Sequence, residues 1–248
     1  MLETRSLCKA YGALKVTDSV DLRVDTGELR AIIGPNGAGK TSLLAQLAGE
    51  LMPDSGSIVL DGQEITRQPS YWRCRNGVAR TYQITSLLKS FSAIDNVRIA
   101  AQGVDGNSYR FLRPMRNEPI LTDKSLDALD AVGLLDQQDV PADELAYGEQ
   151  RQLEIAMALV SRPKLLLLDE PTAGMGADDS IRIVELIRSL KGKLTMVLVE
   201  HDMNTVFGLA DRISVLVHGK ELICGTPDKV RGNPEVRTHY LGGDHAHA

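Results

Sequence analysis

The stretch GPNGAGKT, from Gly34 to Thr41, limits the possible folds of this chain more than any other part of its sequence. It fits the phosphate-binding pattern G-x-x-x-x-G-K-[ST], with a strand-like segment before it and a helix-like segment after it. Gly37 and Gly39 let backbone N–H groups approach phosphate oxygens closely, and the helix that begins near Lys40 adds the positive end of its dipole. The alternative, a plain glycine turn between strand and helix, does not require the full pattern.

This loop predicts a nucleotide site with a magnesium ion. We expect Lys40 to bridge the β- and γ-phosphates and Thr41 to give its hydroxyl to the metal. The residues expected to contact the nucleotide here are Gly34, Pro35, Asn36, Gly37, Ala38, Gly39, Lys40, Thr41 and Ser42.

Two later apolar segments end in ionisable side chains. LLLLDEP ends in Asp169 and Glu170, and LTMVLVEHD ends in a run that contains His201. The carboxyl ends of strands in α/β proteins hold ligands, and neighbouring strand residues point in opposite directions. We therefore assign Asp169 to magnesium, Glu170 to the attacking water as general base, and His201 to charge that develops on the γ-phosphate. Taken alone, the two acids could belong to an ordinary acidic turn after a strand, and the histidine could be a solvated or capping residue.

A second candidate anion site lies more than a hundred residues after the glycine loop. ELAYGEQRQLEIAMAL, Glu144 to Leu159, turns a glycine-containing loop directly into an amphipathic helix. The first turn of a helix has N–H groups without intrahelical partners and carries the positive end of the dipole. The pattern therefore indicates a second place that can hold a negative charge.

Strand-like and helix-like segments alternate along the chain, which predicts an α/β fold with a mostly parallel sheet covered on both faces. GSIVLDGQEI alternates around Asp61-Gly62 and predicts a β-hairpin. Residues from about 84 to 160 lack strand character and predict a helical lobe. Continuous apolar strands return from Lys164 onwards.

Composition and charge argue against a nucleic-acid-binding protein, a membrane-spanning protein and a disulfide-bonded protein. The net charge of -5 gives no general reason to expect a nucleic-acid partner. No apolar run approaches the roughly 20 residues that span a bilayer, so a role at a membrane requires a partner. The three cysteines are far apart and have no metal-ligand spacing, which favours reduced thiols in a cytosolic compartment. Residues 244–248 are expected to form a flexible tail.

Together these motifs resemble the ATP-binding cassette of ABC transporters, over about Leu2 to Gly243. The resemblance implies one ABC ATPase domain over residues 1–243. Its expected fold is a P-loop NTPase (RecA-like) core with a mostly parallel sheet, an N-terminal antiparallel β subdomain, and an α-helical subdomain inserted at about 84–160. It also implies ATP and Mg²⁺ as ligands, and two cassettes that close head-to-tail around two nucleotides.

The resemblance gives roles to further residues. Tyr11 takes the place of the aromatic ring that stacks on adenine, and Gln83 that of the glutamine that contacts magnesium or the water. The signature motif would cover the γ-phosphate of the ATP held by the other cassette. That second role explains why one chain has two anion sites. The signature residues are Leu145, Ala146, Tyr147, Gly148, Glu149 and Gln150.

Within the family, several stretches are similar to cassettes of branched-chain amino-acid importers and of the related urea and amide importers. The implied partners are transmembrane permease subunits, a second identical or different cassette and, indirectly, a periplasmic or extracellular solute-binding protein, with no nucleic acid. The implied location is peripheral, on the cytoplasmic face of the inner membrane, and the isolated chain is expected to be soluble. The alternatives are the energising subunit of a lipopolysaccharide-type exporter, a soluble non-transport ABC ATPase, and a scaffold that binds ATP without hydrolysis.

Two positions depart from the usual family pattern. Ala146 replaces the signature serine, which removes one hydroxyl from the expected γ-phosphate site. Gly176 stands where the loop after the acidic strand usually has an aspartate, so communication between two ATP sites is expected to differ from the common pattern.

Overall fold

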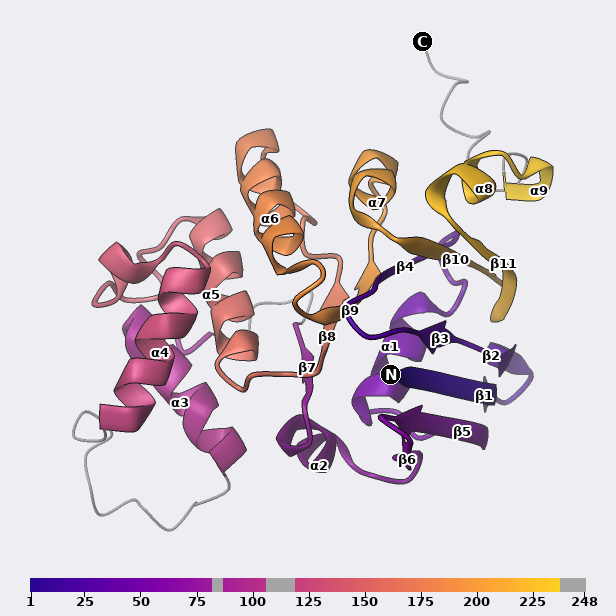
Figure 1. Ribbon diagram of the computed structural model, residues 1–248, viewed down its shortest axis with the longest axis horizontal. Helices are drawn as coiled ribbons and strands as arrows, with labels where there is room; N and C mark the ends of the chain where they lie inside the picture. The colour runs from indigo at the N-terminus through magenta and orange to yellow at the C-terminus, as the bar shows by residue number, and fades with distance from the viewer. Residues whose placement is uncertain (82–86, 106–118, 237–248) are drawn as a thin grey trace. The chain divides into compact units, whose positions relative to one another are not determined.

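A computed structural model describes residues 1–81, 87–105 and 119–236 of the chain (Figure 1). The chain forms two compact units. The first joins Met1–Ser70 to Lys191–Ala248, and the second is Tyr71–Leu190.

The first unit contains an antiparallel sheet built from the N-terminal part of the chain. Its strand order is β2-β1-β5-β6, and β3 pairs with β1. The hairpin predicted at Asp61-Gly62 joins β5 and β6. Both residues have positive φ, 49° and 78°, as a two-residue type I′ turn requires. The strands are β1 (Leu2–Tyr11), β2 (Leu14–Val20), β3 (Arg23–Val24), β5 (Ser55–Leu60) and β6 (Gln63–Glu64).

The same unit contains the parallel strands that the apolar runs predict. β4 pairs in parallel with β9 on one side and β10 on the other, and β11 adds an antiparallel edge. Every residue of β4 and β9 is buried, as in a sheet covered on both faces. The elements are β4 (Leu29–Ile33), α1 (Lys40–Ala48), β9 (Thr195–Val199), α7 (Met203–Leu209), β10 (Arg212–Val217), β11 (Lys220–Gly225), α8 (Pro227–Arg231) and α9 (Pro234–Val236).

The second unit combines a short parallel strand pair, β7 and β8, with helices. Helices α3, α4 and α5 pack against one another within the range predicted to be helical, with Val97, Leu129 and Leu153 fully buried. Helix α6 packs against α5. The elements are α2 (Ser70–Arg75, which begins at the boundary), β7 (Val78–Arg80), α3 (Ala93–Asp105), α4 (Pro119–Ala131), the 3₁₀ turn η2 (Leu135–Gln137), α5 (Tyr147–Leu159), β8 (Leu165–Asp169) and α6 (Ala177–Leu190).

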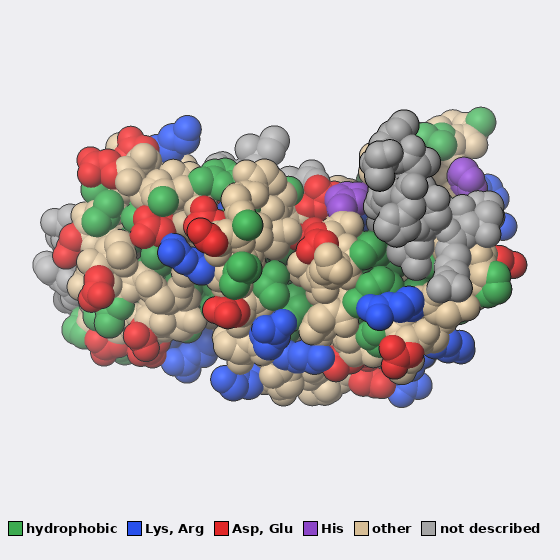
Figure 2. Space-filling model, turned by 90° about the horizontal axis from the view of Figure 1, so that it is seen from above, with side chains coloured by type: hydrophobic (Ala, Val, Ile, Leu, Met, Phe, Trp, Pro, Cys, Tyr) green, Lys and Arg blue, Asp and Glu red, His purple; other side chains and the backbone are tan. Residues whose placement is uncertain are grey.

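The surface is mixed in charge. Acidic and basic side chains are interspersed over the face in Figure 2. Across residues 1–81, 87–105 and 119–236, no helix is both long enough and apolar enough to cross a membrane. All three cysteines are free thiols.

Helix α7, which follows strand β9, is capped at its N-terminus by Asp202. Its carboxylate accepts hydrogen bonds from the N–H groups of Asn204 and Thr205, both at 3.1 Å, and from the Thr205 hydroxyl at 2.6 Å. The hydroxyl bond first, and the two N–H bonds after it, lower the pKa of Asp202 below its ordinary value.

We expect Asp202→Ala to lower the free energy of unfolding by about 1 kcal/mol at pH 7, because three donors lose their acceptor. Because the pKa of Asp202 is lower in the folded than in the unfolded state, its ionisation adds to the free energy of unfolding at pH values above the unfolded-state pKa. This contribution is lost as the pH falls through the folded-state pKa. Urea unfolding at pH 7 and near pH 3 measures both effects.

Asp202→Asn is the matched control, because asparagine caps helices about as well as aspartate but does not ionise. The Asn variant should lack the acid-dependent component. Equal stability of the Ala variant and the wild type at pH 7 would contradict a capping role for Asp202.

Candidate functional site

The predicted phosphate loop connects the buried strand β4 to the first turn of α1. The Lys40 side chain is buried, and its ammonium group donates to the carbonyl oxygens of Gly34 at 2.8 Å and Pro35 at 3.1 Å. The ammonium group therefore lies inside the curve of the loop, at the positive end of the α1 dipole. This arrangement of cation, helix end and loop N–H groups is suited to a polyphosphate.

Two glycines give the loop its curvature. Gly37 has φ of 78° and Gly39 has φ of 99°, both in the left-handed region that glycine adopts without strain. Their surroundings differ. A Cβ atom at Gly39 would collide with the backbone carbonyl oxygen of Val16 in β2, whereas one at Gly37 would meet nothing within 4 Å.

His201 lies in the first unit with the phosphate loop. Strand β9 runs parallel to β4, so the residues that follow each strand emerge at the same edge of the sheet. Glu200 is buried, and its carboxylate accepts the N–H of His201 at 2.8 Å. The His201 side chain itself is exposed beyond this edge. Its predicted place at a carboxyl-end edge is thus confirmed, and its contact with phosphate stays a prediction.

The two predicted acids lie in the second unit, at the end of β8. Asp169 is 2% exposed, and Glu170 is half-buried with φ of 48°, an unusual value for a residue other than glycine. Their environments differ, as the alternation of side chains predicts. The expected roles at magnesium and at the attacking water stay predictions.

Asp169 has a partner that the sequence did not indicate. The guanidinium of Arg80, at the end of β7, lies 2.8 Å from the Asp169 carboxylate, and both groups are buried. β7 and β8 are parallel, which brings their carboxyl ends to one edge. Removing one member of a buried ion pair leaves the other charge uncompensated, so Arg80 fixes the position of Asp169.

The signature segment forms the start of α5, which begins at Tyr147. The Glu149 carboxylate accepts the N–H of Ala146 at 2.9 Å. This bond is the half of a capping box that an acid at the third helical residue supplies; Ala146 has no side-chain oxygen for the other half. Gly148 is buried, and a Cβ atom there would lie 2.7 Å from the Asp179 carboxyl of α6. Only a residue without a side chain fits there unless Asp179 moves.

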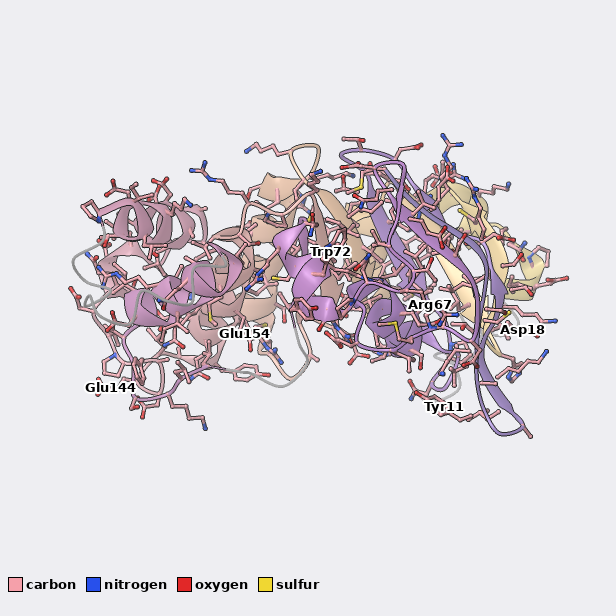
Figure 3. The ribbon with its side chains drawn as sticks, turned by 90° about the horizontal axis from the view of Figure 1, so that it is seen from below. Tyr11, Asp18, Arg67, Trp72, Glu144 and Glu154 are labelled. Carbon is pink, nitrogen blue, oxygen red and sulfur yellow. The ribbon has the colours of Figure 1, made fainter. Side chains whose placement is uncertain are left out.

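Two other predicted residues complete the survey. Tyr11 is 56% exposed at the end of β1, and Figure 3 shows it labelled there. An exposed ring is available for stacking, but its contact with adenine stays a prediction. Gln83 lies outside the described residues. Among the described residues no cluster of three or more His, Cys, Asp or Glu side chains could hold a metal ion.

Comparison with known proteins places these features in one family. Residues 17–173 match the family model described as "ABC transporter", and residues 224–246 match "Branched-chain amino acid ATP-binding cassette transporter". The chain is 36% identical to the high-affinity branched-chain amino acid transport ATP-binding proteins LivG of Escherichia coli (strain K12) and BraF of Pseudomonas aeruginosa, over 98% of each chain. It is 34% identical to the lipopolysaccharide export system ATP-binding protein LptB of Acidithiobacillus ferridurans, covering 98% of this chain and 97% of that one.

Solved structures agree. An ATP-binding cassette of an ABC transporter in its ADP conformation has a TM-score of 0.87 at 27% identity, covering 98% of both chains. The cassette cbiO1 of Clostridium perfringens, part of the ABC transporter complex cbiONQ, has a TM-score of 0.81 at 26% identity and covers 97% of this chain and 96% of its own. The predicted α/β nucleotide-binding fold is therefore confirmed.

The two loop glycines give a matched test of the site geometry. We expect Gly37→Ala to cost roughly 1–2 kcal/mol, because alanine must adopt a left-handed conformation in open space. Gly39→Ala should cost clearly more, because the methyl group also meets the Val16 carbonyl. Urea unfolding of both variants measures the difference, and equal losses would contradict the close approach at Gly39.

Proposed function

Because the chain belongs to the ABC transporter family, as an ATP-binding subunit and an ATPase, we propose that it powers the import of branched-chain amino acids or related small solutes. Full-length identity to LivG and BraF supports this substrate class. The match of residues 224–246 to the branched-chain cassette family favours amino-acid import over lipopolysaccharide export. The similarity to LptB is the observation that supports export as the alternative.

The observation that carries the ATP site is the glycine loop with Lys40 at the start of α1. The Lys40 ammonium exchanges the Gly34 and Pro35 carbonyls for β- and γ-phosphate oxygens, and loop N–H groups bind the same phosphates. Gly37 and Gly39 admit the phosphates close to the backbone. The ring of Tyr11 stacks on the adenine.

Magnesium fits the donors available. The Thr41 hydroxyl is exposed in the first turn of α1, and Asp169 offers a carboxylate; both are hard oxygen donors of the kind that Mg²⁺ prefers. Gln83 is the third residue assigned to it. When bound, the ion neutralises charge on the phosphates. Arg80 pairs with the buried Asp169 carboxylate at 2.8 Å and limits its movement within the second unit.

Glu170 carries the hydrolytic step. Its carboxylate accepts a proton from the water whose oxygen attacks the γ-phosphorus; the bond from the γ-phosphorus to the bridging oxygen breaks, so that ADP leaves and inorganic phosphate forms. His201 donates a hydrogen bond to the γ-phosphate as charge develops on it. The exposed position of His201, on the same sheet edge as the phosphate loop, supports this assignment.

The signature helix α5 serves the ATP of a second cassette. A side chain at Gly148 would fit only if Asp179 moved, and the N-terminus of the helix offers N–H groups to a phosphate. The binding site for the γ-phosphate on one chain is thus completed by the signature of the other chain. The second cassette is a further copy of this chain or a related one.

The remaining partners follow from the transport role. Permease subunits provide the route across the membrane, this chain binds them at the cytoplasmic face, and a solute-binding protein delivers the substrate. The test is reconstitution with the permeases and solute-binding protein of a branched-chain amino-acid importer from the same organism. Stimulation of ATP hydrolysis by leucine-loaded binding protein is expected, and stimulation only by a lipopolysaccharide substrate would support the exporter instead.

We expect Glu170→Gln to abolish turnover while ATP binding persists, because glutamine keeps the size of the side chain but cannot accept the proton. Lys40→Ala should instead weaken binding, since the contact with the β- and γ-phosphates is lost. Steady-state ATPase assays and calorimetric titration separate the two effects. Wild-type turnover in the Gln variant, or unchanged affinity in the Ala variant, would remove the residue from its role.

Mixing two inactive variants tests the shared site. Gly148→Asp adds a negative charge to the first turn of the signature helix, next to Asp179, which disfavours binding of a phosphate at this helix end, and Lys40→Ala disables the chain's own loop. A head-to-tail dimer of one chain of each keeps one site with both halves intact, so partial activity should return. Nucleotide binding by Gly148→Asp alone is the control for folding. Mixtures that stay inactive would show that the two anion sites do not meet across a dimer of this chain.

A further inference from the structure

Tyr147, the first residue of the signature helix, connects α5 to the loop that follows β8. Its side chain is 43% exposed, and its hydroxyl lies 3.2 Å from the carbonyl oxygen of Ala173, 26 residues further along the chain. A Cβ atom at Gly174 would lie 3.6 Å from the same hydroxyl. The phenol therefore rests directly on the backbone of this loop.

A buried arginine fixes the direction of this hydrogen bond. Arg151 donates to the Tyr147 oxygen at 3.1 Å and forms an ion pair with Glu154 at 2.8 Å; Glu154 is labelled in Figure 3. The guanidinium carbon also lies 5.5 Å from the centre of the tyrosine ring. Arginine only donates, so the phenol oxygen accepts from it. The single phenol proton is left for the Ala173 carbonyl.

Ala173 belongs to the same turn as Glu170. Its N–H donates to the Glu170 carbonyl at 3.1 Å, which closes the turn directly after β8. Glu170 has φ of 48°, and such a conformation in a residue other than glycine persists only when its surroundings enforce it. The bond from Tyr147 to the Ala173 carbonyl is one of the contacts that hold this turn in place.

We propose that Tyr147 is a positioning residue that links the signature helix to the turn carrying Glu170. This inference rests on the roles proposed above for Glu170 and for the signature. The helix faces the ATP of the partner chain, whereas Glu170 acts on the ATP of its own chain. A shift of α5 on closure moves the Tyr147 hydroxyl, and through Ala173 it changes the orientation of Glu170. The two ATP sites are thereby coupled inside one chain.

This link also bears on Gly176. The family usually has an aspartate there, and glycine offers no side chain for communication between the sites. The hydroxyl of Tyr147 supplies a contact to the same loop from the signature itself.

The test is Tyr147→Phe, which keeps the ring and its stacking on the Arg151 guanidinium but removes the hydroxyl and its hydrogen bonds with Ala173 and Arg151. We expect kcat for ATP hydrolysis to fall roughly 3- to 10-fold, the equivalent of the lost neutral hydrogen bond to the Ala173 carbonyl, with KM unchanged. Cooperativity in ATP should fall as well. Amide hydrogen exchange over residues 170–176 in the nucleotide-free chain should be faster, because the turn loses its attachment. Glu154→Gln, which loosens Arg151, should change both quantities in the same direction by less.

Tyr71→Phe is the matched control, since Tyr71 lies on α2 with 66% of its side chain exposed. It should leave both measurements at wild-type values. Wild-type kcat and exchange in Tyr147→Phe would overturn the inference. So would slower hydrolysis with unchanged exchange, which would make Tyr147 a direct contact of the partner's ATP. A wild-type chain that fails to hydrolyse ATP would instead refute the proposed function, while the exchange experiment would still decide whether the link exists.

Discussion

The backbone conformation of the loop between β4 and α1 is the constraint on which the rest of this structure depends. The loop must curve tightly enough for Lys40 to reach back to the Gly34 and Pro35 carbonyls. Neighbouring backbone fixes that curve: the N–H of Gly219, between β10 and β11, donates to the Ala38 carbonyl at 3.0 Å, and β2 approaches Gly39 at Val16. These contacts with neighbouring backbone, together with the buried strand before the loop, thus hold the loop in one conformation.

The second unit has a different constraint, which is the placement of the carboxylates of Asp169 and Glu170. Asp169 is buried, and its electrostatic cost is offset by the guanidinium of Arg80. Glu170 is held in a left-handed conformation by a turn to which the signature helix is attached through Tyr147. A cassette of this kind must keep two acids in adjacent positions yet give them different tasks. Burial and an ion pair fix the first acid, whereas the second lies in a turn that the Tyr147 hydrogen bond attaches to the signature helix.

Local chemistry was predictable from the sequence, and contacts between distant segments were not. The glycine loop, the Asp61-Gly62 hairpin and the continuous apolar strands each depend on a few adjacent residues, and each was predicted correctly. The pairing of Arg80 with Asp169, which are 89 residues apart, requires β7 and β8 to be neighbours. The approach of Asp179 to Gly148 likewise depends on how α5 and α6 pack.

The central claim is that the phosphate loop of one chain and the signature of another contact the same γ-phosphate. Vanadate trapped with MgADP occupies the position of that phosphate, and ultraviolet light then cleaves the backbone next to it. Mass spectrometry of the fragments from the assembled dimer would locate the cuts. Two clusters are expected, one within residues 34–41 and one within residues 145–150. Cuts confined to residues 34–41 would contradict a site shared between two chains.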